Sequence, residues 1–452
     1  MLFKKTAAKK PLVAVCGNIF FSQIVQKFAF SLLLKVFSTG FSFLITVLLA
    51  RQLGAEGYGI YAFATAVMLL VSIPVQAGLP ELVVRETAKG VALGELGKVL
   101  GVWRWSGSIA LLFSLALVLL VIPILFLLQG NLSVQLFWSL LFAVILASLM
   151  ALCNLVGSAV RGLNRVIAGL TPELLIRPGI LFFTLAGLAH LTGMQLTPAI
   201  AMAVHVSAAL LALLFAVWFL LRIMPATVRG SHADIHGKLW LRSIFPLAII
   251  GAMQAVNLRT DVFIMGLFWP SDQVGIYHVA LQVATFSSFG LQAVNMSLSP
   301  RFAELFAKKD ILGLQWLVSV SAKAVFLFCS FIVVIFTLFG VTLLELFFGQ
   351  EFVLSYVPLL LLFGGQLVSS AVGSVGFLLI MTGNERVVAK AFTVGALTNI
   401  ALNVLLIPRF GTVGAAVATS ASMATWSILL WSAAKTTLGI DSIAFKSIKK
   451  LG

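Results

Sequence analysis

Six charged side chains interrupt the long apolar stretches of this 452-residue sequence: Lys35, Glu173, Arg177, Arg259, Asp261 and Lys323. A charge at the centre of a bilayer costs roughly 2.5–3.5 kcal/mol on insertion scales, so these residues are the first candidates for a functional site. Four of them are cations, and arginine and lysine are the side chains that bind phosphate. We therefore predict a cationic cavity that binds an anionic ligand through Arg259, Lys35, Lys323 and Arg177.

The depth of each cation separates functional from structural interpretations. Arg259 is the strongest candidate for lining a cavity, because it lies deep in its expected span and far from the cytoplasmic end. Lys35 and Lys323 lie nearer the cytoplasmic ends of their spans, from where a long side chain can snorkel to the interface. Substrate binding and snorkelling both remain open for these two lysines.

The other charges also carry two interpretations each. Glu173 precedes Arg177 by four residues, a spacing that favours an ion pair along one helix. Glu173 and Asp261 are the candidates for coupling an ion, and Asp261 has an alternative as a cap near the external end of its span. Arg85 and Arg301 are a candidate gate or phosphate-collecting pair, although we favour ordinary cytoplasmic anchoring for both.

Motifs for nucleotide, metal or catalytic chemistry are absent from the sequence. The pair Gly97-Lys98 resembles the end of a phosphate-binding loop, but Val99 follows it and the upstream glycine is missing. The stretch 231–236 (SHADIH) has metal-ligand residue types, but a solvated linker is the better interpretation. We therefore predict a protein that is not an enzyme and has no cofactor and no metal.

Composition and apolar runs indicate the elements that must position these charges. The sequence is 61% hydrophobic and only 10% charged, too few charges to cover a soluble fold of this size. Runs of roughly 20 apolar residues are long enough to cross about 30 Å of hydrocarbon. We predict an all-α integral membrane protein with about twelve transmembrane helices, at 28–50, 58–79, 105–128, 135–158, 172–192, 198–221, 244–268, 274–298, 317–340, 356–380, 388–407 and 412–435.

The basic residues predict the orientation of these spans. With the N-terminus in the cytoplasm, nearly all lysines and arginines outside the spans fall on the cytoplasmic side, and only Arg51 and Arg409 lie outside. This positive-inside pattern favours an even number of spans with both termini cytoplasmic. The net charge of +16 is explained by this topology, so we predict no nucleic-acid partner.

An internal repeat divides the chain. When the sequence is shifted by 216 residues, residues 59–85 align with 275–301 without a gap, and ten of 27 positions match, including Gly59 with Gly275. Residues 161–168 and 382–389 form a second, shorter match. Six spans in each half give both repeats one orientation, related by a pseudo-two-fold axis along the membrane normal, a plan that transporters use.

The repeat and the charge pattern together predict five segments. They are a basic, interfacial or span-extending N-terminal segment (1–27), a six-helix bundle (28–222), a cytoplasmic linker (223–243), a second six-helix bundle (244–436) and a basic cytoplasmic tail (437–452).

Several stretches resemble one family of transporters. They are LLARQLGAEGYGIYAFATA (48–66), GLPELVVRETA (78–88), TDVFIMGLFWPSDQVGIYHVALQV (260–283), LLELFFGQEF (343–352) and TGNERVVAKAFTVGALTNIALNVLLIPRFGTVGAAVATSAS (382–422). The sequence resembles the polysaccharide-export flippases of the multidrug/oligosaccharidyl-lipid/polysaccharide (MOP) transporter superfamily. The run NIALNVLLIPRFGTVGAAVAT is the most specific piece, through the spacing of its asparagines, Ile-Pro and glycines.

The resemblance implies a fold and a function. The fold is two six-helix bundles around a cleft, as in the multidrug exporters of the superfamily. The function is alternating-access transfer of polyprenyl-diphosphate-linked oligosaccharide to the outer leaflet of the bacterial inner membrane, for O-antigen, capsule or exopolysaccharide. The implied partners are that lipid-linked glycan, the bilayer, and polymerase and chain-length machinery.

Four alternatives stay open, and the weakest is a non-transporting scaffold, against which the intact charges of the predicted cavity argue. A lipid-linked peptidoglycan precursor flippase has similar chemistry, but some relatives carry two extra helices. A cation-coupled multidrug exporter would better fit an anionic interior. A membrane-bound polymerase or ligase would need large external loops with catalytic residues, and the external loops predicted here are short.

Overall fold

The computed structural model describes the backbone of residues 10–191, 193 and 195–444. It describes side chains from residue 33 onward, apart from those of 192, 194, 226, 242, 243, 245–247, 249, 250, 254, 293, 296, 297, 299, 300 and 445–452. Residues 1–9 of the predicted N-terminal segment and 445–452 of the predicted tail lie outside the described residues. Residues 10–27 form the beginning of the first helix.

The first half of the described chain consists of helices. They are α1 (Lys10–Gln76), α2 (Leu79–Leu93), α3 (Leu96–Leu128), η1 (Gln129–Asn131), α4 (Val134–Gly162), α5 (Val166–Thr171), η2 (Pro172–Ile176), α6 (Arg177–Leu191) and α7 (Pro198–Ile223). Local sequence explains several ends: Ser133 and Thr197 accept the N-terminal amides of α4 and α7 on their hydroxyls. Gly78 and Gly94 have left-handed backbone at the two ends of α2.

The linker and the second half of the described chain also consist of helices. Their elements are α8 (Ala226–Arg229), α9 (Gly237–Phe268), α10 (Ser271–Ser287), α11 (Phe289–Ala307), α12 (Ile311–Phe348), η3 (Gln350–Ser355), α13 (Tyr356–Val372), α14 (Val375–Met381) and α15 (Glu385–Leu438).

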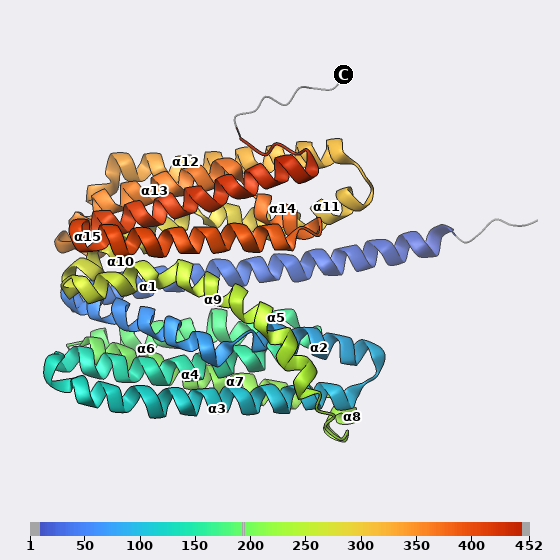
Figure 1. The fold of residues 1–452 in the computed structure, drawn as a ribbon, viewed down its shortest axis with the longest axis horizontal. Helices are drawn as coiled ribbons and strands as arrows, with labels where there is room; N and C mark the ends of the chain where they lie inside the picture. Colours follow the sequence, from blue (N-terminus) through green and yellow to red (C-terminus); the bar gives the residue numbers. More distant parts are fainter. Residues whose placement is uncertain (1–9, 192, 194, 445–452) are drawn as a thin grey trace, which may run out of the picture.

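Two of the long helices turn back on themselves at a glycine. The backbone of α1 leaves helical geometry at Gly54, with φ of 66°, and that of α15 does so at Gly411, with φ of 53°. Figure 1 shows the chain reversing within α1, whose two arms lie one above the other. Each of these elements therefore contains two of the predicted spans.

Eight helices of the described residues are long and apolar enough to cross a membrane, and α1 and α15 are among them. The predicted seventh span corresponds to α9. The predicted eighth span, 274–298, is divided at Ser288 between α10 and α11. The all-helical membrane fold is confirmed, and the count of twelve spans stays a prediction.

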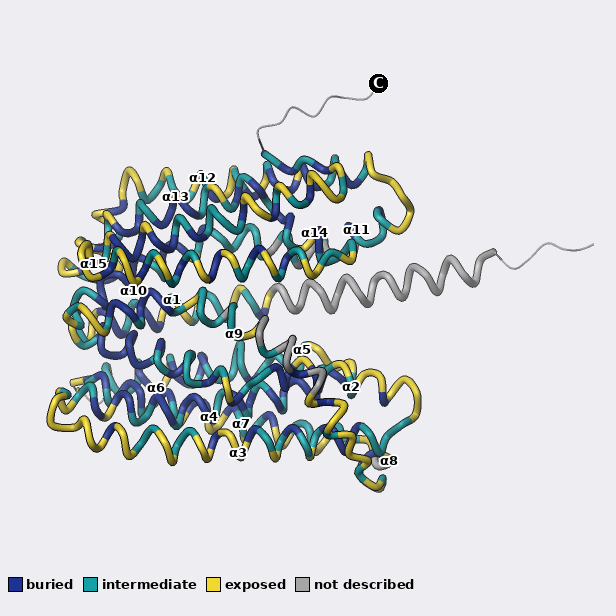
Figure 2. The backbone as a smooth tube through the Cα atoms, viewed as in Figure 1, coloured by how far each residue is buried: buried dark blue, intermediate teal, exposed yellow. Residues whose placement is uncertain are grey.

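The helices form two groups, and three further helices lie between these groups. In Figure 1, α2 to α7 lie together below, α11 to α15 lie together above, and α1, α9 and α10 lie between the groups. Large apolar side chains are exposed along the outer helices, for example Leu112 and Leu119 on α3 and Leu327 and Leu338 on α12. Figure 2 shows exposed residues along α3 and α12 and buried residues around α10 and the adjoining part of α1. An exposed apolar surface of this extent fits contact with lipid.

The backbone of the central linker contacts the first half, while the side chains of His232, Asp234 and His236 remain exposed, which agrees with the prediction of a solvated stretch at 231–236. The backbone amide of Asp234 donates to the carbonyl oxygen of Gly97 at 2.9 Å. A Cβ on Gly101 would lie 2.0 Å from the carbonyl oxygen of Asp234, so only glycine allows this approach. His236 Nε2 lies 3.0 Å from Asp234 Oδ2 at the surface, and the described residues contain no metal-type cluster.

Candidate functional site

A cavity of about 320 Å³ lies between the two groups of helices and is lined from both of them. Its lining includes Glu173, Arg177 and His205 from the first half and Arg259 and His278 from the second. A neighbouring hollow of about 370 Å³ shares Met68, Leu69, Met150 and Glu173 with it. The two hollows therefore adjoin, and they extend toward Gln76 and Glu81, at the end predicted to be cytoplasmic.

Arg259 is held in this cavity by a histidine, which is itself hydrogen-bonded to a tyrosine. Its Nη1 lies 3.0 Å from Nε2 of His278, which is buried on α10. The other ring nitrogen of His278, Nδ1, lies 2.7 Å from the hydroxyl of Tyr58 on α1. The prediction from depth that Arg259 is a cavity residue agrees with this position, and contact with substrate stays a prediction.

Arg177 has the same kind of support on the opposite wall. Its Nη1 lies 3.2 Å from Nε2 of His205 on α7, and Nδ1 of His205 lies 3.0 Å from the hydroxyl of Tyr61. Tyr58 and Tyr61 are neighbours on one turn of α1, with ring centroids 6.4 Å apart. One helix turn of α1 therefore supports both arginines.

The expected ion pair between Glu173 and Arg177 is not present among the described residues. Residues 172–176 form a π-helical turn, η2, in which hydrogen bonds join residue i to i+5. The wider turn removes the stacking of positions i and i+4 on which the prediction depended. Glu173 lines the cavity without an ion-pair partner within 4.0 Å in the described structure, and Arg177 contacts His205 instead.

Asp261 is buried, does not line the cavity, and accepts hydrogen bonds on both carboxylate oxygens. Its Oδ2 accepts from the hydroxyl of Tyr277 at 2.5 Å and from that of Thr419 at 3.2 Å, and its Oδ1 accepts from the amide of Val262 at 2.7 Å. These bonds join α9, α10 and α15. Asp261 therefore joins three helices in the interior, and both the interface cap and ion coupling stay predictions.

The two predicted lysines lie elsewhere in the described structure. Lys35 on α1 and Lys323 on α12 are half-buried, and neither lines the central cavity. The structure therefore does not bring them together with Arg259 and Arg177.

Arg85 and Arg301 lie at the surface and contact nearby glutamates. Arg85 Nε lies 2.9 Å from Glu86 Oε1, and Arg301 Nη1 lies 2.5 Å from Glu304 Oε2. Hydrogen bonds from Lys308 and Arg301 lower the pKa of the Glu304 carboxyl. These local pairs fit anchoring, and a gating role for the arginines stays a prediction.

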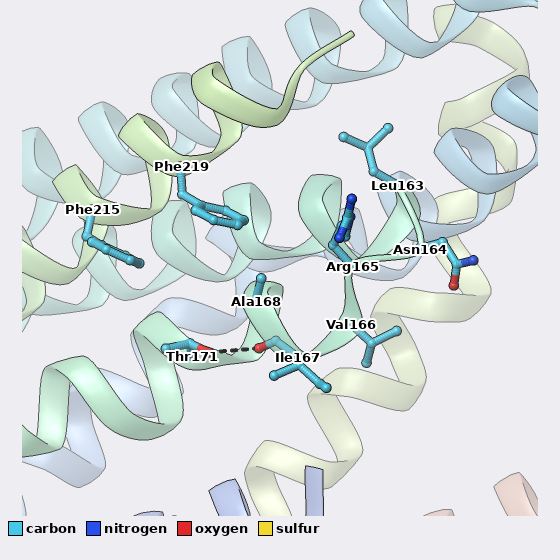
Figure 3. A pocket seen from close by; sticks show the side chains of 9 residues that line it. All are labelled: Leu163, Asn164, Arg165, Val166, Ile167, Ala168, Thr171, Phe215 and Phe219. Carbon is cyan, nitrogen blue, oxygen red and sulfur yellow. Dashed lines mark hydrogen bonds between the residues drawn. The ribbon is translucent and has the colours of Figure 1, made fainter. Parts of the chain in front are cut away.

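A wider groove of about 650 Å³ lies apart from this site, between α5 and α7 (Figure 3). Phe215 and Phe219 form one wall, Ile167 and Thr171 contribute to the other, and Arg165 projects near its end. The groove shares no lining residue with the central cavity, so size alone does not identify the functional site.

The tyrosine and histidine residues of the site were not predicted from the sequence. A search for charged side chains passes over neutral histidine, although His205 and His278 lie within apolar spans just as Arg259 does. A polar ring in such a span is a usable signal, because a buried polar group needs a hydrogen-bond partner.

Comparisons with known proteins agree with this architecture. A family model described as "Polysaccharide biosynthesis protein" matches residues 24–306. The chain is 27% identical over 405 residues to the probable low-salt glycan biosynthesis flippase Agl15 of Haloferax volcanii, covering 87% of this chain and 80% of that protein. A shorter match, 26% identical over 176 residues, covers 38% of this chain and 32% of an uncharacterized membrane protein of Methanocaldococcus jannaschii.

Solved structures show the same fold at low identity. An inward-facing multidrug resistance transporter of the MATE family and MOP superfamily gives a TM-score of 0.73 at 13% identity, covering 88% of this chain and 96% of that one. The lipid II flippase MurJ in an inward closed conformation gives 0.68 at 17% identity, covering 90% and 87%. The chain therefore has the fold of MOP-superfamily transporters.

Proposed function

The chain belongs to the family of polysaccharide biosynthesis proteins, and from this premise we propose that it is a flippase for polyprenyl-diphosphate-linked oligosaccharides. It moves these glycans from the cytoplasmic to the outer leaflet by alternating access and catalyses no covalent step. The fold shared with MOP transporters and the likeness to a probable glycan biosynthesis flippase both support this function.

The observation that carries the proposal is the pair of arginines in the central cavity. Arg259 and Arg177 face one hollow from opposite halves, and each guanidinium touches a neutral imidazole instead of a carboxylate. A diphosphate cannot enter hydrocarbon without partners for its charge, and bidentate guanidinium groups are such partners. The oligosaccharide is accommodated in the cleft while the polyprenyl chain remains in the bilayer.

The remaining charged residues have assigned roles within this proposal. Lys35 and Lys323 contact the diphosphate at other stages of transfer, and Arg85 and Arg301, for which anchoring is the favoured role, are the candidate pair for collecting or gating it at the cytoplasmic ends of their helices. Glu173 and Asp261 are the candidates for ion coupling. Of these two, Glu173 is the one that lines the cavity.

The cellular setting is part of the same proposal. The protein spans the bacterial inner membrane with both termini in the cytoplasm, and the glycans serve O-antigen, capsule or exopolysaccharide synthesis. Polymerase and chain-length proteins act after it. The likeness to an archaeal protein also fits a broader class of surface glycans.

Leaflet transfer in proteoliposomes tests the function directly. A fluorescent polyprenyl-diphosphate oligosaccharide is scored by its accessibility to an impermeant glycosidase, with wild type compared with Arg259→Ala, Arg177→Ala and Lys35→Ala. Wild-type transfer that falls at least about tenfold in the folded Arg259→Ala protein supports the flippase and its cationic site. Transfer unchanged in all three variants would reject the site, and no transfer by wild type with several glycans would reject the function.

A further inference from the structure

We propose that His278 and His205 are positioning residues that hold Arg259 and Arg177 as charged donors for the two phosphoryl groups of one diphosphate. The inference rests on the proposed function and names the residues that orient the arginines toward the diphosphate. It assigns a role to two histidines and two tyrosines that no charged-residue pattern identifies.

The hydrogen-bond polarity of each contact is determined by the arginine. A guanidinium has only N–H donors, so Nε2 of His278, 3.0 Å from Arg259 Nη1, must accept. The ring proton is then on Nδ1 and is donated to the hydroxyl oxygen of Tyr58, 2.7 Å away. The same reasoning gives His205 an accepting Nε2 toward Arg177 and a donating Nδ1 toward Tyr61. Both histidines are therefore neutral in this arrangement.

A neutral acceptor leaves the charge of the arginine available. A carboxylate at the same place would hold the guanidinium equally well but would cancel its charge and compete with an anionic ligand. An imidazole fixes one N–H and leaves the other donors and the full positive charge facing the cavity. Glu173 is the one carboxylate that lines the cavity among the described residues. It forms no ion pair with Arg177, so both guanidinium groups keep their charge available for an anionic ligand.

Arg177 also has a donor without an acceptor. Its Nε is buried and has no hydrogen-bond partner among the described residues. Buried donors are nearly always paired in folded proteins, so this group indicates that an acceptor binds there. A phosphoryl oxygen that took both Nε and the free terminal nitrogen would give Arg177 a two-point contact.

The hydrogen-bonded residues form two relays, Tyr58–His278–Arg259 and Tyr61–His205–Arg177. Both relays start on the same turn of α1, and their arginines belong to different halves. Tyr58 and Tyr61 lie three residues apart on α1, and both have their hydroxyls buried. The Tyr61 relay stays within the first half, whereas the Tyr58 relay crosses to α10 and α9 of the second half. One arginine from each half facing a shared cavity suits a ligand with two adjacent anionic groups, and a monophosphate would engage them less completely.

Ligand binding by the full-length protein in lipid nanodiscs tests the relays. The probes are farnesyl diphosphate and farnesyl monophosphate, measured by isothermal calorimetry. The variants are His278→Leu and His205→Leu, which remove the acceptor, and His278→Gln and His205→Gln, which retain an acceptor for the arginine. His190→Leu is the matched control, because His190 is exposed at the end of α6. Tyr58→Phe and Tyr61→Phe supply milder variants if a leucine protein does not insert.

We expect wild type to bind the diphosphate more tightly than the monophosphate. Each leucine variant should weaken diphosphate binding about tenfold and reduce that preference, while the glutamine variants stay within about threefold of wild type. The phenylalanine variants should weaken binding about threefold, and His190→Leu should not change it. Leucine and phenylalanine variants that bind as wild type does, or glutamine variants as weak as the leucine ones, would overturn the inference.

The failure of the relays can be distinguished from failure of the proposed function. Diphosphate binding that depends on the histidines in a protein that flips no glycan lipid would leave the relays standing and reject the flippase. If the protein transfers the glycan lipid but its affinity for the diphosphate does not change when either histidine is replaced, only the role of the relays is rejected.

Discussion

Gly59 on α1 and Gly275 on α10 lie against one another where the two halves meet, and neither position has room for a side chain. A Cβ on Gly59 would lie 1.6 Å from the carbonyl oxygen of Ser271, and one on Gly275 would lie 2.2 Å from that of Ala55. Ser271 and Gly275 are the repeat equivalents of Ala55 and Gly59, each 216 residues later. The duplicated segments therefore contact each other in the fold, at the end of the cleft predicted to be external.

Alanine at either glycine should separate the two helices at this crossing. For Gly59→Ala and Gly275→Ala we expect a loss of about 1–3 kcal/mol of stability, because the added methyl group meets backbone that cannot rotate away. Amide hydrogen exchange in residues 55–61 and 271–277 should rise, and glycan transfer should fall. Gly107→Ala on α3 is the control, since nothing lies within 4 Å of its added Cβ. Exchange and melting like wild type in both variants would contradict a tight crossing.

A second pair of contacts holds the turn at Gly54 against the other half. Glu351 Oε2 accepts the amide of Ala55 at 2.8 Å, and Arg51 Nε donates to the carbonyl oxygen of Phe347 at 2.8 Å. We expect Glu351→Ala to lower stability by about 0.5–2 kcal/mol, the usual cost of removing a helix cap. Thermal unfolding in nanodiscs measures it, with exposed Glu345→Ala as the control. Equal melting of the two variants would show that the cap does not join the halves.

The fold followed from sequence where the signal was periodic or repeated. The match of 59–85 with 275–301 predicted two related halves, and hydropathy located the long helices. The break of the predicted span 274–298 could not be foreseen from hydropathy. At this point the hydroxyls of Thr285 and Ser288 bond to the carbonyl oxygens of Gln282 and Thr285, and such local bonds compete with helix continuation.

The sequence predicted individual charged residues of the site but not their hydrogen-bond partners. Depth in the span placed Arg259 in the interior, where the structure has it. The partner of Arg177 could not be predicted, because the π-helical turn at 172–176 changes which positions share a helix face. The pairing of His278 with Tyr58 joins residues 220 positions apart, and no local pattern records such a contact.

The guanidinium geometry of the cavity predicts that lysine cannot replace arginine. Arg259→Lys retains the charge but loses the planar set of donors that reaches His278 and an anion together. We expect transfer of the lipid-linked glycan to fall about tenfold in Arg259→Lys and further in Arg259→Ala, measured in proteoliposomes. Arg222→Lys is the control, because Arg222 is an exposed residue beside Trp218, 5.7 Å from its ring centroid. Full activity of Arg259→Lys would mean that charge alone suffices.

The charge of the proposed substrate predicts what drives its export. Moving about two negative charges outward in an inside-negative cell releases about 2.3 kcal/mol per charge per 100 mV, or about 4–5 kcal/mol in total. We expect transfer in proteoliposomes to accelerate with an imposed inside-negative potential and to slow when an ionophore collapses it, at fixed sodium and proton concentrations. Glu173→Gln and Asp261→Asn should keep this response if no ion is coupled. A different result would establish ion coupling. In that case the transfer rate of wild type would not change with the potential but would follow a sodium or proton gradient, and the variant of the coupling carboxylate would lose its dependence on the gradient. The potential alone is sufficient for export only if the diphosphate crosses the membrane in its ionised form. Two charged arginines, each held by a neutral histidine, would stabilise that ionised form during transfer.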